Sequence, residues 1–276
     1  MNNILTVDVE DWFHICGIED ILSQDRLSQF ESRVAQNTLK IMDILKQKKV
    51  KATFFVLGCI AERHPSLVKD IQKHGHEIAT HGYGHQRVYT MTPDTFRKDL
   101  KKSMSVISQI TGSDIKGFRA PEWSIRDDSL WALDILEQEG FMYDSSMAPL
   151  PIIGNSGYIR TPHVLSLNEG RLWEVPPLVA FTPLANLPLG GGWGLRTFPY
   201  SFIRSSIRKL NRQAQPALIY LHPREFDREN PRIQLPLVTK FVLHAGLEPT
   251  QNRLDRLLED FTFTTVSDIL EQLSEN

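Results

Sequence analysis

The chain has 276 residues and is 41% hydrophobic, which suffices for one large domain with a substantial core or for two small domains. Its net charge of −2, from 31 basic and 33 acidic residues, gives no reason to expect nucleic acid as a partner. No apolar run approaches the roughly 20 residues of a membrane span, and no basic segment followed by an apolar run marks a secretory signal. The sequence predicts a soluble cytoplasmic protein, with Cys16 and Cys59 as reduced thiols rather than a disulfide framework.

Strand-like apolar runs alternate with helical patterns along the first half of the chain. The pattern predicts strands at 4–9, 52–57, 77–80, 116–119 and 141–144, and helices at 31–48, 65–74, 93–110 and 127–138. The helix that begins at Pro93 has Thr92 as a plausible N-cap and stops at Gly112. Further strands are expected at 217–221 and 261–266, with a helix at 255–260. Such alternation predicts a parallel sheet with right-handed crossovers, which closes into an α/β barrel when repeated around a circle.

The stretch 149–199 interrupts this alternation. It is rich in proline and glycine, including Gly190, Gly191 and Gly192, and has few helical patterns. It is too long for an ordinary connection, so it is predicted to be a functional insertion or lid. Because no second core is visible, the whole chain, 1–276, is expected to be a single domain.

Chemically capable residues follow four of the predicted strands. Barrel enzymes build their sites at the carboxyl ends of the strands, where these residues would meet. Two imidazoles and a carboxylate can hold a divalent metal with positions left for water and substrate. His81 and His85 would share one face of a helix, but Gly82 and Gly84 between them favour a loop. The strand-end residues are Asp8 to Asp11, His81 and His85, Arg119, and His222.

Five segments, in this order, resemble the polysaccharide deacetylase family, carbohydrate esterase family 4, also called the NodB homology domain. They are TVDVED at 6–11, HGYGH at 81–85, FRAP at 118–121, WEVP at 173–176 and YLHP at 220–223. Four further segments resemble a subgroup associated with exopolysaccharide and O-antigen biosynthesis: GGGW at 190–193, LHPREFD at 221–227, PR at 231–232 and NRL at 252–254. The resemblance implies a distorted (β/α)7 barrel that removes acetyl groups from N-acetylated sugars with a divalent metal, commonly zinc.

The resemblance also implies roles for individual residues. Asp8 would be the general base, and Arg119 would pair with it and orient it. His81 and His85 would be metal ligands, and His222 would be the general acid.

The chain departs from the family pattern at several positions. Val9 stands where the family usually has its metal-binding aspartate, so the third ligand would be Glu10 or Asp11. Strand alternation places Glu10 on the same side as Asp8, which favours Glu10 and leaves Asp11 as the alternative. Gly82 replaces a usual serine or threonine, and the fourth motif is abbreviated. Glu122 replaces a usual tyrosine, and its acidic side chain would be unfavourable if it pointed into the site.

Tryptophans near the motifs are candidates for stacking on sugar rings, although tryptophan also fills cores. Trp193, among the glycines of 149–199, is the best candidate, beside Trp123 and Trp173. The charged residues after His222, at 224–227, fit a solvated turn as well as a substrate contact.

The sequence therefore predicts an enzyme: a metal-dependent deacetylase acting on an N-acetylated sugar of a polysaccharide or its precursor. Two histidines and a carboxylate suit zinc, cobalt, nickel or iron. The alternatives are an amidohydrolase of the same fold acting on a non-sugar C–N bond, and an inactive glycan-binding relative.

Overall fold

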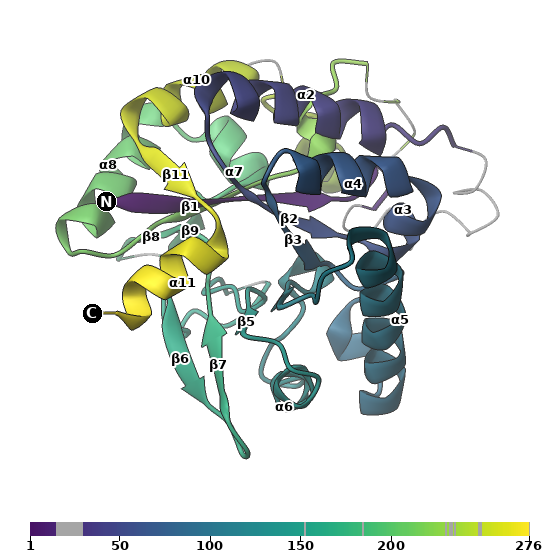
Figure 1. Cartoon of the computed structure of the whole chain (residues 1–276). Coiled ribbons are helices and arrows are strands. Elements are labelled where there is room, and N and C mark those ends of the chain that lie inside the picture. Colours follow the sequence, from purple (N-terminus) through teal and green to yellow (C-terminus); the bar gives the residue numbers. More distant parts are fainter. Residues whose placement is uncertain are drawn as a thin grey trace.

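The fold is a curled sheet of parallel strands with helices along its outer side (Figure 1). The computed structural model describes residues 1–14, 30–151, 153–183, 185–229, 231, 234, 236–247 and 250–275, so Cys16 and Arg232 lie outside it. Among these residues, seven strands run parallel in the order β10-β1-β2-β3-β4-β5-β7. Strand β11 also pairs parallel with β1, outside this order, and β6 pairs antiparallel with β7. This confirms the distorted (β/α)7 barrel that the sequence predicts.

The elements have the following bounds. The strands are β1 Asn2–Val9, β2 Thr53–Val56, β3 Glu77–Thr80, β4 Gly117–Phe118, β5 Tyr143–Asp144, β6 His163–Ser166, β7 Arg171–Glu174, β8 Val179–Phe181, β9 Asn186–Pro188, β10 Leu218–Leu221 and β11 Thr262–Thr264. The helices are α2 Val34–Lys48, α3 Gly58–Arg63, α4 Pro65–Lys73, α5 Pro93–Thr111, α6 Trp131–Gln138, α7 Gly192–Thr197, α8 Tyr200–Arg212, α9 Leu237–His244, α10 Thr250–Asp260 and α11 Val266–Ser274. Short 3₁₀ turns are η1 Val88–Thr90, η2 Pro121–Trp123 and η3 Pro223–Phe226.

Side-chain alternation along β1 decides which of its residues enter the barrel. Leu5 and Val7 pack into the large core between the sheet and the helices. Ile4 belongs instead to a second apolar cluster, together with Phe55 of β2 and residues of α11. Asp8 has the same parity as Ile4, so the strand directs it to the inner side of the sheet. A buried polar residue near the carboxyl end of a central strand is where a barrel carries its chemistry.

Where a helix has clear capping residues, its bounds agree closely with those that the sequence predicts. The Thr92 side chain accepts a hydrogen bond from Thr95 N, and α5 ends at Gly112, which has the left-handed φ of 68°. In contrast, α6 begins at Trp131 rather than at 127, and α10 already begins at Thr250. None of the helices in the described part of the chain is both long and apolar enough to cross a bilayer.

The stretch 149–199 contributes to the sheet itself. Its strand β7 pairs parallel with β5, and β6 and β7 form the hairpin that projects at the bottom of Figure 1. The stretch also contains the β8–β9 pair and α7. Part of the expected insertion is therefore a strand of the barrel.

Candidate active site

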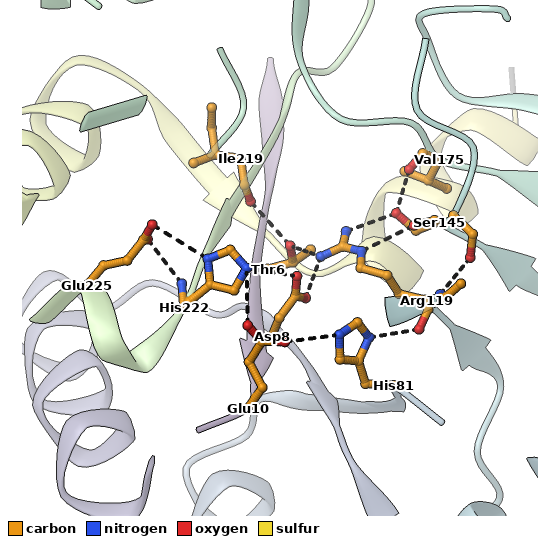
Figure 2. Close-up of polar contacts among 12 residues, drawn as sticks. Thr6, Asp8, Glu10, His81, Arg119, Ser145, Val175, Ile219, His222 and Glu225 are labelled. Atoms are coloured by element: carbon orange, nitrogen blue, oxygen red, sulfur yellow. Dashed lines mark hydrogen bonds and ion pairs between the residues drawn. The ribbon is translucent and has the colours of Figure 1, made fainter. Parts of the chain in front are cut away.

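A buried ion pair occupies the centre of the sheet (Figure 2). Arg119, which follows β4, is fully buried and donates from Nη1 to Asp8 Oδ1 at 2.6 Å and to Thr6 Oγ1 at 2.8 Å. Its other nitrogens donate to Ser145, to the carbonyl oxygen at 3.2 Å and to Oγ at 2.9 Å. The guanidinium lies 4.1 Å from the Phe55 ring centroid. These fixed contacts leave Asp8 Oδ2 as the carboxylate oxygen that does not accept from Arg119.

Glu10, His81 and His85 form a cluster whose donor set suits a divalent metal. Their ligand atoms all lie within 4.8 Å of one another. Glu10 Oε2 is 2.9 Å from His85 Nε2 and 3.6 Å from His81 Nε2, close to the separation of about 3.3 Å between two tetrahedral ligands of zinc. His81 Nδ1 donates to the Arg119 carbonyl oxygen at 2.8 Å, which leaves the Nε2 lone pair directed to the cluster. The residues present therefore fit such an ion.

The charges around Glu10 favour its ionised form. Burial raises the pKa of the Glu10 carboxyl. The neighbouring His85 and His222 and a hydrogen bond with His81 lower this pKa by more than burial raises it. The net result is a pKa well below the ordinary value, so a carboxylate is present near neutral pH.

The 81–85 segment is a loop, as its glycines predict, and α5 holds it in place. Gly82 has a φ of 78°, a conformation that glycine adopts without steric penalty. The Asp99 carboxylate on α5 accepts from Tyr83 N at 2.8 Å and from Gly84 N at 3.3 Å. Sequence analysis did not single out Asp99, because only the packing of α5 brings it to the loop.

Asp11, the alternative third ligand, has a different set of contacts. Its Oδ1 accepts from Trp12 N at 3.1 Å and from Arg33 N at 3.0 Å, so it joins the end of β1 to the start of α2. It is not part of the cluster with the two histidines, whereas Glu10 is.

His14, which is not among the site residues that the sequence predicts, lies in the site. It lines the cavity and stacks on His85, with ring centroids 5.2 Å apart. Burial and the neighbouring His85 lower the pKa of His14 to about 3, so its ring is neutral near pH 7. A neutral ring against His85 limits the positions that the His85 ring can take.

His222 follows β10 and faces the carboxylates of Asp8 and Glu10 from the side opposite His81 (Figure 2). Its Nε2 is 3.8 Å from Asp8 Oδ2 and 3.7 Å from Glu10 Oε1. Glu225 lies behind the ring: Oε2 accepts from His222 N at 3.1 Å, and Oε1 is 3.5 Å from Nδ1. Burial raises the pKa of Glu225, but His222 and Arg196 lower it to about 2, so Glu225 is a carboxylate near neutral pH.

The turn after His222 is buried rather than solvated. Arg224, Glu225 and Asp227 are 4%, 1% and 2% exposed, which excludes a solvated charged turn. Glu225 pairs with Arg196 at 3.2 Å, and Asp227 binds Arg33 and Asn37. A charged sequence segment alone gives no indication that folding removes it from water.

The candidate base, metal ligands and acid line one cavity of about 350 Å³: Asp8, Glu10, His81, His85 and His222. Trp123 and Trp193 also line it, and Trp193 packs beside Phe198 and Phe241. Trp173 does not line this cavity: it lies on β7, beside the second apolar cluster. The structure thus brings two of the three candidate tryptophans to the site.

Glu122 reaches the cavity but has a basic partner. Arg87 donates to its carboxylate from Nε at 2.8 Å and from Nη2 at 3.1 Å. Glu122 and Trp123 both have positive φ, 54° and 55°, which is unusual for residues other than glycine and recurs at functional sites. Because Arg87 neutralises its charge, Glu122 is not unfavourable at this position, contrary to what the sequence suggested.

Two family models match consecutive parts of this chain. The model described as polysaccharide deacetylase matches residues 25–141, and a domain of unknown function, DUF3473, matches residues 145–271. The Bacillus cereus peptidoglycan-N-acetylglucosamine deacetylase is 33% identical over 131 residues, which are 43% of this chain and 47% of that protein. Part of the chain, residues 25–141, thus matches the polysaccharide deacetylase family.

Another relative matches to a similar extent, and a solved structure shares the fold. The peptidoglycan deacetylase of Helicobacter pylori is 30% identical over 139 residues, covering 50% of this chain and 46% of that protein. The matched part is thus about half the length of these curated relatives. A crystal structure from Mycobacterium smegmatis, assigned as a polysaccharide deacetylase, superposes with a TM-score of 0.64 at 22% identity and covers 100% of this chain and 92% of that chain. This likeness shows the polysaccharide deacetylase fold.

A second acidic pair lies where β5 and β7 of the deacetylase sheet end. Asp144 and Glu174 are neighbours in register, and both are fully buried. Ser146 donates to Asp144, and Met147 N donates to Glu174 Oε1 at 3.0 Å. Burial raises the pKa of Asp144 to about 6, and burial together with the Asp144 charge raises that of Glu174 well above the ordinary value. The two carboxyl groups therefore retain a proton near neutral pH.

This pair makes the stability of the protein depend on pH. Because both folded-state pKa values exceed the unfolded ones, its contribution is complete below about pH 4 and is lost as pH rises through 6 and above. Glu174→Gln should flatten this dependence, as measured by urea unfolding between pH 5 and 8. Equal slopes for both proteins would contradict the shared proton.

Proposed function

We propose that the protein is a metal-dependent hydrolase that removes the N-acetyl group of an amino sugar in a polysaccharide or its biosynthetic precursor. One observation carries the proposal: a base, a metal-binding donor set and an acid line a single cavity at the carboxyl ends of parallel strands. The base is Asp8, the donors are Glu10, His81 and His85, and the acid is His222.

The chain's own residues account for the proton transfers of amide hydrolysis. Asp8, held and charge-paired by Arg119, takes a proton from the attacking water, whose oxygen bonds to the acetyl carbon. His222 gives a proton to the nitrogen as the C–N bond breaks, so acetate and a free amine leave. Glu225 positions the His222 ring and supplies a negative charge beside its Nδ1.

Zinc is the ion that we propose for Glu10, His81 and His85, although the donor set also suits cobalt, nickel and iron. When bound, a divalent metal supplies Lewis-acid polarisation of the acetyl carbonyl and lowers the pKa of water toward about 7. Glu10 supplies the one negative ligand, which keeps the site positive overall.

Both halves of the chain contribute to the proposed reaction. Asp8 and Glu10 precede the stretch that matches the deacetylase model, whereas His222 and Trp193 belong to the stretch that matches DUF3473. Strand β10 from the second stretch pairs with β1, which carries Asp8. We therefore propose that 1–276 forms one catalytic unit.

The substrate that we propose is a surface glycan or its precursor, with Trp193 and Trp123 stacking on sugar rings. The segments at 190–193 and 221–227 support the exopolysaccharide and O-antigen subgroup through their resemblance to it. The cytoplasmic location stays a prediction.

Metal analysis and acetate release test the proposal together. We expect about one metal ion per chain and acetate release from N-acetylglucosamine oligomers that a chelator abolishes and zinc or cobalt restores. Asp8→Asn should retain the metal and lose turnover, because it alters the base without touching the three ligands. Absence of both metal and acetate after supplementation would instead favour the glycan-binding alternative. Metal without acetate, but with hydrolysis of another amide, would favour the non-sugar amidohydrolase.

A further inference from the structure

Arg224 is a buried cation in the cavity for which the described residues provide no acceptor. It lies on η3, two residues after His222, and lines the same cavity. Its Nε and Nη1 are buried and make no hydrogen bond with any part of the chain that the structure describes. Removing a guanidinium from water without an acceptor is unfavourable, so such a group normally has a partner in the working state.

The carboxylates in and beside the cavity already have cationic or imidazole partners within hydrogen-bond or ion-pair distance. None of the described carboxylates forms an ion pair with Arg224, and Glu225, its neighbour in sequence, is held by Arg196 at 3.2 Å. The pairs are Asp8 with Arg119, Glu10 with His85, Glu122 with Arg87, and Glu225 with Arg196. The positive charge of Arg224 is thus available to a group that comes from outside the chain.

Arg126 is the other arginine that lines this cavity, and its situation differs. It is partly exposed, its Nε and Nη2 donate to Asp128, and its guanidinium lies 3.7 Å from the Tyr89 ring centroid. Its charge is therefore balanced within the chain, and it serves as a matched control.

We propose that Arg224 binds a negatively charged substituent of the substrate, a carboxylate or a phosphate carried near the N-acetyl group. The inference rests on the proposed deacetylation and names the substrate class for the same cavity. A guanidinium presents a planar fork that matches either anion with two hydrogen bonds. Because Arg224 is on the same turn as His222, an anion held there would fix the sugar beside the proposed acid. A uronic acid residue is one source of the charge, and the phosphate of a nucleotide- or lipid-linked sugar is the other.

The test compares substrates that differ in this charge. Rates of acetate release by the zinc-loaded protein are measured on a neutral N-acetylglucosamine tetramer, on a tetramer alternating N-acetylglucosamine with glucuronate, and on UDP-N-acetylglucosamine. We expect kcat/KM to be higher for one of the charged substrates, which identifies carboxylate or phosphate as the source. Arg224→Gln should lower kcat/KM on that substrate by about 10- to 100-fold, the loss expected for hydrogen bonds to a charged group. On the neutral tetramer, Arg224→Gln should change kcat/KM by less than about threefold.

Arg224→Lys and Arg126→Gln complete the series. Arg224→Lys keeps the charge without the planar fork, so part of the preference should remain. Arg126→Gln should leave the ratio of charged to neutral kcat/KM unchanged. Equal losses on all substrates in Arg224→Gln, or loss of the preference in Arg126→Gln, would overturn the assignment.

Two readouts do not depend on turnover and separate this inference from the proposed function. The metal-free protein should bind the charged probes in calorimetry more tightly than the neutral tetramer, and Arg224→Gln should remove the difference. The thermal midpoint of Arg224→Gln should equal or exceed that of the unaltered protein, because the described residues give Arg224 no acceptor that the substitution would remove. Charge-dependent binding without acetate release would remove only the deacetylase proposal. Acetate release without charge-dependent binding, or a lowered midpoint, would remove the role of Arg224.

Discussion

Glu10→Gln is expected to release the bound metal and to abolish nearly all acetate production. Glu10 is the carboxylate of the cluster with His81 and His85, and its charge would offset that of the proposed ion. The amide of glutamine keeps the shape but loses the charge, so metal affinity should fall by more than about 100-fold. Because the carbonyl then loses its Lewis acid, kcat should fall by about 1000-fold or more. Metal content after dialysis and acetate release measure the two effects separately.

Asp11→Asn is the matched control for this substitution. It removes the neighbouring buried carboxylate, and asparagine can still accept the hydrogen bonds that Trp12 N and Arg33 N donate to Oδ1. We expect this variant to keep the metal. Loss of metal from Asp11→Asn with retention in Glu10→Gln would reverse the ligand assignment.

The parts of the fold that the sequence predicted are those with a strong local signal. The strands around Asp8 and His81 are short apolar runs that end in polar residues, and the α5 helix has a cap at each end. Strand β7 was missed because four residues in a segment rich in proline and glycine have too little periodicity to identify. Its pairing with β5 depends on how distant segments come together in the sheet, which no local pattern records.

The candidate site likewise contains residues with a local signal in the sequence and residues whose role depends on packing. Strand alternation favoured Glu10 over Asp11, and the structure places Glu10, not Asp11, beside both histidines. Asp99 was not singled out, and Glu225 was weighed only as part of a charged turn, because each acts on another residue: Asp99 holds the 81–85 loop and Glu225 contacts His222. A side chain that positions another is recognisable only after the elements have packed. Burial of the charged turn at 224–227 is likewise a property of the packed chain.

His222→Ala is expected to retain the metal and to lower kcat by about 100- to 10,000-fold, the contribution of a general acid. Its Nε2 faces Asp8 and Glu10 at 3.8 and 3.7 Å, but His222 is not one of the three clustered ligands. For a substrate whose leaving group is better than a sugar amine, kcat should fall less in this variant, because that leaving group needs less protonation. Substantial activity on N-acetylated sugars in this variant would refute the role.

The proposed acid, His222, also depends on Glu225. Variants of Glu225 and Asp227 together distinguish an effect on the reaction from an effect on stability. Glu225→Gln should lower kcat about tenfold, because Glu225 accepts a hydrogen bond from His222 N and places its Oε1 3.5 Å from the ring Nδ1, which positions the ring. The variant also leaves the buried Arg196 without its partner, so some stability is lost. Asp227→Asn provides the comparison: it removes a buried carboxylate paired with Arg33, two residues further along. If both variants lowered the thermal midpoint but only Glu225→Gln lowered kcat, the effect would come from the contact of Glu225 with His222. If kcat fell in both variants or in neither, Glu225 would only stabilise the turn.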